Sequence, residues 1–538
     1  MKLLYPKKII LNENIKNICN IKKPCSLQIG LNESKTFILK ANAKILLDFG
    51  EEVVGSIRIL TYKTSKSGKV RIVFGESVSE CLSTIGEYNS TNDHSTRDMI
   101  VKLEDLSDMI YGNTGFRFVL LETIDNSEVE LKKIIALNNA FSFPAIGSFK
   151  CDNDVINNIF ETATNTLRLC IQNNMIWDGI KRDRLVWAGD LHPEILGILY
   201  LFGDLDNIKN SLLFVKEETK KGKWINNIPS YSLWWIICLF DYYMFTKNTD
   251  FVLDQLEYVI QIVKQLDKSI SSDGQINYGF NFINWDMYTN DKNDKVKIND
   301  EEASLHALSI ISLQKAKILF EIFNFKTELC DNILKRLKSK EYKVSKYMAS
   351  SAFRVFAGID DENDKNILLQ NNLETFSTFM SYYIMKARNK FKYNSKTIDM
   401  LIDYYQAMLD LGSTTFWEQF DYNWKDNALK VDQIPNKCYN DIYKLCGKEC
   451  YRGYRKSLCH GWSCGPIQYL FEVVGGIKIV EAGCKEIEVN PTLFNLNYID
   501  IVFPTPYGNI SITHKKINGK IQTNYSCPKE VKLNVINN

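Results

Sequence analysis

The sequence of 538 residues lacks the patterns that define several large protein classes. It has no run of about 18 apolar residues, so no membrane-spanning helix is expected. The N-terminus has no uninterrupted apolar core of the kind found in signal peptides, because Lys and Asn interrupt its short apolar pieces. The formal net charge is only +2, which gives no reason to expect a nucleic acid or a membrane as partner. These absences favour a globular, cytoplasmic protein of about two to four domains.

Several catalytic and metal-binding motifs are missing as well. The closest cysteine pairs are Cys446 with Cys450 and Cys459 with Cys464, and neither has the CxxC spacing of a zinc site. The sequence contains no GxSxG, GxxxxGKS, GxGxxG or HExxH pattern, which argues against several hydrolase, nucleotide-binding and metalloprotease classes. The 14 cysteines are scattered, so we expect reduced thiols rather than a disulfide framework.

The sequence does contain one segment rich in both charge and tryptophan, Trp177–Glu194, which reads WDGIKRDRLVWAGDLHPE. Its acidic residues are Asp178, Asp183, Asp190 and Glu194. Carboxyl groups can transfer protons in glycosidic cleavage, and flat indole rings can pack against the C–H faces of a sugar. The segment therefore indicates a carbohydrate-cleaving pocket. The alternative is a structural network of ion pairs in a buried loop.

The pattern of hydrophobic residues divides the chain into three regions. Residues 1–147 contain short β-branched and aromatic runs separated by turn residues, which predicts an N-terminal antiparallel β-sandwich or jelly roll. Residues 148–475 change to a helical period, and several of these helices are apolar around most of their circumference, as in a two-layered helical barrel. Residues 476–538 return to strand alternation and predict a small C-terminal β-sandwich with a structural role.

A long polar insert, Gly75–Asp98, separates two of the predicted N-terminal strands. It contains, among other charged residues, Glu76, Glu87, Asp93, His94 and Asp98. A loop of this length is usually either functional or mobile. Two interpretations stay open: a surface excursion, or a loop that reaches the mouth of the barrel, within the same chain or across a dimer.

Four loops between predicted helices combine tryptophan with acids, amides, hydroxyls or histidine. They are Trp224–Trp235, Asn277–Thr289, Ser413–Trp424 and Ser457–Pro466. In a helical barrel the loops at one end converge on a central cavity, so these loops and Trp177–Glu194 predict a pocket with aromatic walls and polar anchors. Glycosidic cleavage needs two carboxyl groups. The acids of Trp177–Glu194 offer the first, and Glu418, which lies among aromatic residues, is our candidate for the second.

The same residues resemble the bacterial α-L-rhamnosidases of glycoside hydrolase family 78. The family's motif of an Asp, an Arg, the acid and then Trp-x-Gly-Asp is matched by Asp178, Arg182, Asp183 and Trp187–Asp190. A second motif, Gly-x-Thr-Thr-x-Trp-Glu, is matched by Gly412–Glu418, and a Ser-Leu-x-His motif by Ser457–His460. Strands of both β regions are similar to those of the family. The resemblance therefore covers nearly the whole chain, in the same order.

The resemblance implies an (α/α)6 barrel catalytic domain flanked by N-terminal and C-terminal antiparallel β-sandwich domains. It also implies exo-acting, inverting hydrolysis of terminal α-L-rhamnosyl residues, with Asp183 as general acid and Glu418 as general base. Asp178 and Asp190 would bind rhamnose hydroxyls. No metal and no organic cofactor is needed for such a mechanism. The further substrate contacts that we expect are Arg182, Trp187, Trp234, Trp285, Asp286, Trp417, His460 and Trp462.

Two departures from the family pattern leave alternatives open. Many members have Asp-Glu-Arg where this chain has only Asp183-Arg184, and Asn284-Trp285-Asp286 stands where an Asp-Trp pair is expected. The alternatives are a non-catalytic sugar-binding or sensing protein on the same barrel, or a glycosidase for another deoxyhexose or a uronate. In each case the partner is a carbohydrate or glycoside, and a homodimer is compatible with the sequence.

Overall fold

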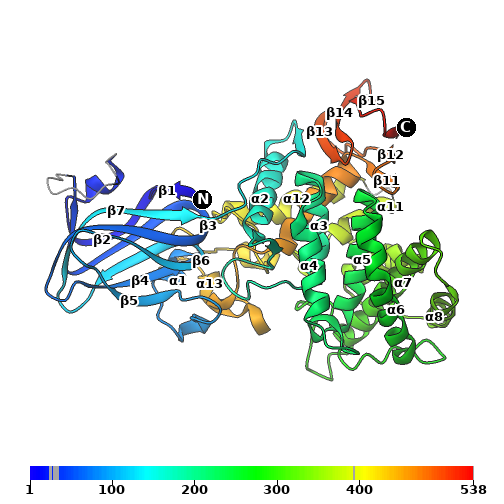
Figure 1. Cartoon of the computed structure of the whole chain (residues 1–538), viewed down its shortest axis with the longest axis horizontal. Helices are drawn as coiled ribbons and strands as arrows, with labels where there is room; N and C mark the ends of the chain where they lie inside the picture. The colour runs from blue at the N-terminus through cyan, green and yellow to red at the C-terminus, as the bar shows by residue number, and fades with distance from the viewer. Residues whose placement is uncertain (24–26, 28–34, 392–393, 537–538) are drawn as a thin grey trace.

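The computed structural model describes residues 1–23, 27, 35–391 and 394–536 of the chain. Figure 1 shows an N-terminal β region, a helical region, and a C-terminal β region that packs on the helices. The predicted order of β, helical and β regions is confirmed. Within the described ranges, no helix is both long and apolar enough to cross a membrane. The cysteines in those ranges all carry free thiols.

The N-terminal β region is a seven-stranded sheet that folds back on itself around an apolar core. The long strand β3 (Phe37–Ser65) makes this arrangement, since β7 (Glu128–Asn138) pairs with both its first and its last part. The register shifts beside Gly55, where a Cβ atom would overlap the carbonyl oxygen of Leu137, so the close approach requires glycine. The other strands are β1 (Lys2–Leu4), β2 (Lys8–Lys16), β4 (Lys69–Gly75), β5 (Asp98–Lys102) and β6 (Ser107–Thr123).

Six inner helices form a closed ring, in which each helix contacts the next and the last contacts the first. In ring order they are α3 (Leu191–Phe202), α5 (Pro229–Thr246), α7 (Lys295–Ile322), α9 (Met348–Ala357), α11 (Ser381–Lys390) and α14 (Gly465–Tyr469). Helix α3 is buried along its whole length and α5 along most of it, because their sequences are apolar on nearly every face.

Six outer helices alternate with the inner ones along the chain. They are α2 (Asp154–Cys170), α4 (Asp206–Glu217), α6 (Thr249–Ser269), α8 (Glu328–Ser339), α10 (Glu362–Leu368) and α12 (Asn394–Asp410). Most of them are amphipathic, with one buried and one exposed face, as a second layer requires. Because an outer helix precedes each inner one, the loops that enter the inner helices gather at one end of the ring. All the sequence motifs of the predicted site lie in those loops or at the first turns of inner helices.

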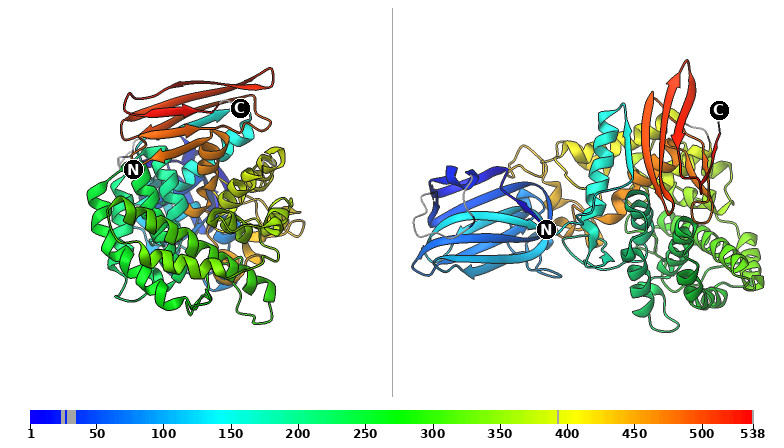
Figure 2. Two further views of the ribbon diagram at one scale, coloured as in Figure 1. Left: turned by 90° about the vertical axis from the view of Figure 1, so that its right-hand side faces the viewer. Right: turned by 45° about the horizontal axis from the view of Figure 1, so that its top comes forward.

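The C-terminal β region consists of two sheets that cover one side of the helices (Figure 2). One contains β11 (Ile477–Glu481), β12 (Glu486–Val489) and β16 (Lys532–Val535), and the other contains β13 (Tyr498–Thr505), β14 (Gly508–Ile517), β15 (Lys520–Ser526) and β8 (Ser148–Cys151). Strand β8 precedes all the helices of the ring but pairs with β13. Asn537 and Asn538, which belong to the predicted C-terminal sandwich, lie outside the described residues.

Four short elements lie in the connections. A hairpin of β9 (Ile171–Gln172) and β10 (Met175–Ile176) follows α2 and leads directly into Trp177. Helix α1 (Val78–Cys81) lies in the polar insert of the N-terminal region, and α13 (Ile442–Leu445) lies in the long connection before α14. Residues of α1 and α13 contact each other, so the insert and this connection meet in the folded protein.

Asp300 on α7 fixes the loop that enters the next inner helix. It is buried, and it accepts hydrogen bonds from the backbone N–H groups of Ser345, Lys346 and Tyr347 at 2.6–2.8 Å. Asp300→Ala leaves these donors without their acceptor, so we expect a loss of roughly 3 kcal/mol or more of unfolding free energy. Urea unfolding followed by circular dichroism measures it. Asp254→Ala, at an exposed position of α6, is the control and should change little; equal midpoints for the two variants would contradict the assignment.

Candidate active site

The segment Trp177–Glu194 forms a loop that leads into α3. Two hydrogen bonds of 3.0 Å close the loop: the Asp178 N–H donates to the Leu185 carbonyl, and the Leu185 N–H donates to Oδ1 of Asp178. Between these residues, Asp183 and Arg184 both have left-handed backbone conformations, with φ of 52° and 55°. Such conformations are costly for residues other than glycine and persist only where surrounding contacts hold them.

The guanidinium of Arg182 links the two predicted catalytic carboxylates. Its Nη1 lies 3.0 Å from Oδ1 of Asp183, and its Nη2 donates to Oε1 of Glu418. The side chain is buried, and its Nε donates to the carbonyl of Arg455 at 2.9 Å. Burial opposes the charge of Arg182, but Glu418 and then Asp183 raise the pKa of its guanidinium well above the usual value. The structure thus brings Asp183 and Glu418 together around one permanent cation.

Backbone contacts on both sides fix the position of Glu418. Its N–H donates to the Ser457 carbonyl, and the Ser457 N–H donates to its Oε2, both at 3.0 Å. Its own carbonyl accepts hydrogen bonds from the Thr378 hydroxyl at 2.8 Å and from Nε1 of Trp462 at 3.0 Å. The backbone of Glu418 is therefore held by the loop that enters α11 and by the rest of its own loop, which leads into α14, and its carboxylate is held by the Ser457 N–H.

His460 lies between Asp190 and Glu418. Its Nε2 is 3.0 Å from Oδ1 of Asp190, and its Nδ1 is 4.0 Å from Oε1 of Glu418. Burial alone would lower the pKa of the imidazole, but Glu418 and Asp190 outweigh burial and raise it. Burial raises the pKa of Asp190, and the hydrogen bond with His460 opposes that effect. Asp190 occupies the N-cap position of α3, so its place is set by the start of an inner helix.

Asp178 and Glu194 are buried carboxyl groups whose charged forms receive little stabilisation. Burial raises the pKa of Asp178 well above its usual value, and His460 opposes this only in part. Neither carboxyl oxygen of Glu194 has a hydrogen-bond partner among the described residues, and burial raises its pKa well above the usual value too. We therefore expect Glu194 to carry a proton at neutral pH. The Glu194 side chain packs against Gly461, next to His460.

Aromatic rings from several loops form one continuous series of contacts beside these carboxyl groups. In order, the rings are those of Trp187, Tyr231, Phe282, Trp285, Tyr451, Trp462 and His460. Neighbouring centroids in the series are 4.6–6.4 Å apart. At one end of the series, the carbonyl of Trp187 accepts a hydrogen bond from the N–H of Asp190. Near the other end, Nε1 of Trp462 donates to the backbone carbonyl of Glu418. The series can provide the apolar wall that a sugar ring packs against.

A pocket of about 380 Å³ lies next to this wall and includes Trp285 and Asp286. Nε2 of Gln419, the residue after Glu418, donates to Oδ1 of Asp286 at 2.6 Å. Burial raises the pKa of Asp286, and the hydrogen bond from Gln419 opposes it. The pocket also contains the side chains of Lys297, Lys346 and Lys448, so its lining is strongly polar.

The rings of Trp234 and Trp417 contact other parts of the helical region. Trp234 is buried in α5, where it stacks on His192 with centroids 5.1 Å apart. It lines a second cavity of about 640 Å³ between the inner helices. Trp417 packs against Phe420 and Tyr443. The substrate contacts that the sequence suggests for these two tryptophans stay predictions.

Sequence reasoning missed several residues of this site. Tyr231, Phe282 and Tyr451 complete the aromatic series, and only the loops that contain the first two were singled out. The polar insert of the N-terminal region also reaches the site within the same chain, since Nδ1 of His94 accepts the Asp183 N–H at 2.8 Å. The unusual content of acids and histidine in the insert was the signal for its role, but nothing in the sequence indicated what it contacts.

The six helix pairs and the C-terminal sheets define a six-hairpin glycosidase arrangement, and comparisons with known proteins agree. Residues 144–323 match the family model of the bacterial α-L-rhamnosidase six-hairpin glycosidase domain, and residues 476–537 match that of the bacterial α-L-rhamnosidase C-terminal domain. Over these two regions the chain is similar to the bacterial α-L-rhamnosidases. The resemblance predicted from the sequence is confirmed. No curated protein sequence matches the chain.

Solved rhamnosidase structures share the fold. The family 78 rhamnosidase of Bacillus sp. GL1 is 19% identical with a TM-score of 0.73, and the match covers 97% of this chain and 55% of that one. The rhamnosidase from Klebsiella oxytoca, solved with rhamnose bound, is 18% identical with a TM-score of 0.64, over 87% of this chain and 95% of that one. The α-L-rhamnosidase from Dictyoglumus thermophilum is 14% identical with a TM-score of 0.69, over 99% and 58%. The chain thus spans about half of the Bacillus protein but nearly all of the Klebsiella protein.

The unpartnered carboxyl group of Glu194 gives a pH-dependent prediction. Because its pKa is raised in the folded protein, the folded state binds up to one proton more than the unfolded state between the unfolded pKa of about 4.3 and the raised folded pKa. The wild-type protein should then lose stability relative to Glu194→Gln as the pH rises, by up to about 1.4 kcal/mol per pH unit. Denaturant unfolding of both proteins between pH 5 and 8 measures the difference. A constant difference across this range would contradict the prediction.

Proposed function

We propose that the protein is an exo-acting α-L-rhamnosidase that removes terminal rhamnosyl residues with inversion of configuration. The observation that carries the proposal is the pair of carboxylates, Asp183 and Glu418, which meet at the guanidinium of Arg182. Both lie in segments that match the motifs of the family. The three solved structures compared above are rhamnosidases, and the one from Klebsiella oxytoca contains rhamnose. This supports rhamnose as the sugar.

The proposed reaction uses the two carboxyl groups in opposite roles. The Asp183 carboxyl group donates its proton to the glycosidic oxygen as the bond between that oxygen and the anomeric carbon breaks. The Glu418 carboxylate accepts a proton from a water molecule whose oxygen attacks the anomeric carbon from the opposite face. The products are the free alcohol and rhamnose of inverted anomeric configuration. In an inverting enzyme the two carboxyl groups stand about 6.5–9.5 Å apart, which leaves room for the water.

The groups around this pair suit the recognition of a sugar. A protonated Asp178 can donate a hydrogen bond to a hydroxyl, whereas Asp190 and His460 together offer an acceptor and a donor. The aromatic series from Trp187 to Trp462 provides the face on which the apolar side of a deoxyhexose packs. Arg182 donates to Oε1 of Glu418, and the backbone N–H of Ser457 donates to its Oε2.

We infer from the same comparisons that the closed ring and its outer helices form the (α/α)6 barrel of the family. On this proposal the N-terminal sheet of residues 1–147 and the C-terminal sheets of residues 476–538 are the flanking β-sandwiches, and residues 148–475 form the barrel domain. The pairing of β8 with β13 supports assigning residues 148–151 to the C-terminal sandwich instead of the barrel. The apolar faces of both β regions are buried, as packed sheets require.

One observation favours a second function, a non-catalytic sugar-binding protein. Nη1 of Arg182 lies 3.0 Å from Oδ1 of Asp183, and Asp183 stands alone where many members of the family have Asp-Glu, so its carboxyl group has a shorter reach than that of a Glu. Isothermal titration calorimetry with L-rhamnose separates the two functions when it is combined with a panel of aryl glycosides. Binding without hydrolysis of any member of the panel would favour the non-catalytic protein. The panel includes other deoxyhexosides and uronides, because these sugars are the remaining alternatives.

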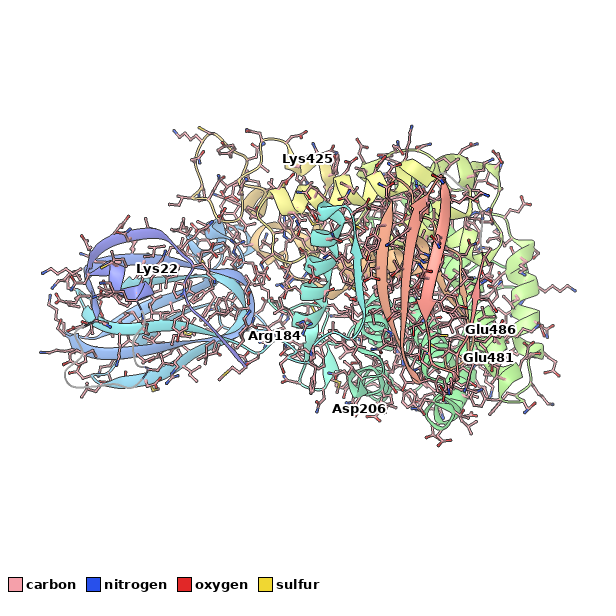
Figure 3. The ribbon with its side chains drawn as sticks, turned by 90° about the horizontal axis from the view of Figure 1, so that it is seen from above. Lys22, Arg184, Asp206, Lys425, Glu481 and Glu486 are labelled. Atoms are coloured by element: carbon pink, nitrogen blue, oxygen red, sulfur yellow. The ribbon has the colours of Figure 1, made fainter. Side chains whose placement is uncertain are left out.

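Asp183→Asn and Glu418→Gln test the proposed roles directly. Each removes one proton-transfer group and keeps its shape, so each should lower kcat on an aryl α-L-rhamnoside by roughly 10²- to 10⁴-fold with little effect on folding. Release of the aryl alcohol is measured by absorbance, and circular dichroism checks the fold. Asp206→Asn, at an exposed residue at the start of α4 that is labelled in Figure 3, is the matched control and should keep full activity. Full activity of either active-site variant would refute its assigned role.

Inversion is tested separately from the roles of the residues. Proton NMR of the first minutes of hydrolysis should show β-L-rhamnose before mutarotation produces the α-anomer, because the attacking water approaches from the face opposite to the leaving group. Initial appearance of the α-anomer would instead indicate a retaining mechanism with a covalent intermediate.

A further inference from the structure

The polar insert Gly75–Asp98 is anchored to the sheet from which it extends. Arg97 is buried, and its guanidinium donates to the Thr114 hydroxyl at 2.9 Å and to the Gly115 carbonyl at 2.8 Å. The same guanidinium donates to Oε1 of Glu80 at 3.0 Å. The insert is therefore a fixed part of the N-terminal region, and its tip has a defined position.

Two contacts hold the tip of the insert against the candidate site, one on each side of His94. Asp93 forms an ion pair with the guanidinium of Arg455, and the hydroxyl of Ser95 donates to the Lys181 carbonyl at 3.1 Å. His94 itself has a left-handed backbone with φ of 63°. These contacts place its imidazole ring directly against the loop that carries Asp183.

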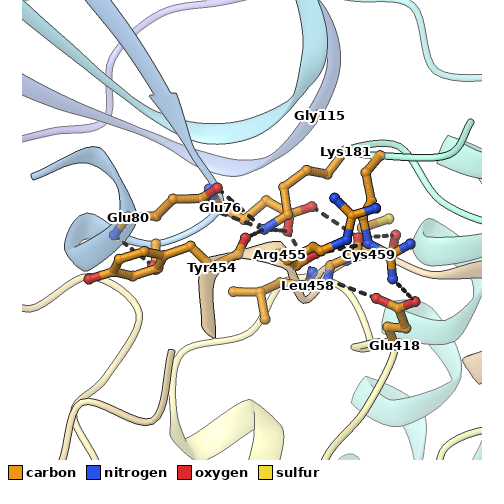
Figure 4. A network of polar contacts seen from close by, with 12 residues as sticks. Glu76, Glu80, Gly115, Lys181, Glu418, Tyr454, Arg455, Leu458 and Cys459 are labelled. Atoms are coloured by element: carbon orange, nitrogen blue, oxygen red, sulfur yellow. Dashed lines mark hydrogen bonds and ion pairs between the residues drawn. The ribbon is translucent and has the colours of Figure 1, made fainter. Parts of the chain in front are cut away.

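A buried network connects the insert with both predicted catalytic loops (Figure 4). Nζ of Lys181 lies 3.1 Å from Oε2 of Glu76 and 3.3 Å from Oε1 of Glu80. Oε2 of Glu76 also accepts the Leu458 N–H at 2.6 Å, next to the Ser457 N–H that binds Glu418. One group of acids from the N-terminal region therefore supports the loops of both carboxylates.

The contact between His94 and Asp183 involves both the backbone and the side chain of the acid. Nδ1 of His94 accepts the Asp183 N–H at 2.8 Å, so that nitrogen carries no proton and the neutral ring is protonated on Nε2. The same Nδ1 lies 3.3 Å from Oδ1 of Asp183. Nη1 of Arg182 lies 3.0 Å from the same Oδ1, so Asp183 is held by His94 through its backbone and by Arg182 through its carboxyl group.

We propose that His94 is a positioning residue for the general acid: by accepting the Asp183 N–H it fixes the left-handed backbone of Asp183 and with it the position of the carboxyl group. This inference rests on the proposed function. The backbone position of Asp183 matters because the carboxyl group of Asp is one methylene closer to its backbone than that of Glu. A small shift of the backbone therefore moves the proton donor out of reach of the glycosidic oxygen. The N-terminal region thus completes the catalytic site of the helical region.

The test uses aryl and alkyl α-L-rhamnosides whose leaving alcohols differ in acidity. A general acid matters most for a poor leaving group, so His94→Ala should lower kcat on methyl rhamnoside by roughly 10- to 100-fold. On 2,4-dinitrophenyl rhamnoside, which needs little protonation, kcat should fall less than about threefold. KM should change little on either substrate, because His94 is not assigned a contact with the sugar. His94→Asn offers an amide oxygen where Nδ1 stands and should restore most of the lost rate.

Two controls separate positioning from a merely structural role. Glu87→Gln changes an exposed acid of the same insert, whose hydrogen bond with Thr84 stays within the insert, and should leave all rates unchanged. Circular dichroism and thermal unfolding check the fold of each variant. Equal losses on both substrates, no loss at all, or no rescue by His94→Asn would overturn the proposal for His94. A wild-type protein that hydrolyses neither substrate would instead refute the proposed function.

The tautomer of His94 is a readout that does not depend on activity. Histidine labelled with ¹⁵N in the full chain should give, at neutral pH, a signal with a proton on Nε2 alone, and His94→Asn identifies that signal by its loss. The proposal is also overturned if the signal shows a proton on Nδ1, because that nitrogen could not then accept the Asp183 N–H.

Discussion

The buried guanidinium of Arg182 is the interaction on which the candidate site depends. A buried cation is tolerated only when surrounding acceptors compensate for lost hydration, and removing one of them typically costs about 3–5 kcal/mol. Arg182 finds its acceptors in its own neighbour Asp183, in Glu418 and in the Arg455 carbonyl. These groups come from three separate stretches of the chain. The guanidinium of Arg182 therefore has all of its acceptors only when these loops have reached their final positions.

Much of the architecture and the identity of the acids could be predicted from local patterns. Helices such as α3 and α5 are apolar on nearly every face, which already indicates an inner layer, and Asp178, Asp183 and Glu418 stand in recognisable motifs. Other features depend on contacts between distant segments, which no local pattern encodes. The role of Trp234 illustrates the limit: a helical period predicts that the ring is buried, but it does not tell which cavity the ring faces.

The insert of the N-terminal region shows the same limit for the site. Its length and its charge marked it as unusual, but a loop that belongs to one sheet and acts on another region cannot be distinguished from a surface loop by composition. The contacts that place the insert at the site are long-range: Lys181 forms ion pairs with two acids of the insert, and His94 accepts a hydrogen bond from the Asp183 N–H. Buried ion pairs add little net stability but fix one arrangement strongly, because any other leaves a charge uncompensated. In this protein they fix the two regions relative to each other.

The pairing of β8 with β13 places the helical region between two adjacent strands of one sheet. These strands are neighbours in one sheet, although the whole ring of helices lies between them in the chain. Beyond the strands, Asp152 and Asn497 are joined by hydrogen bonds of 3.1–3.3 Å, so the chain that leaves β8 lies beside the chain that enters β13. In terms of chain topology, the helices form one long insertion between adjacent strands. The C-terminal sheet is therefore completed only after the entire ring has been synthesised, and its closure ties the first and last parts of the ring together.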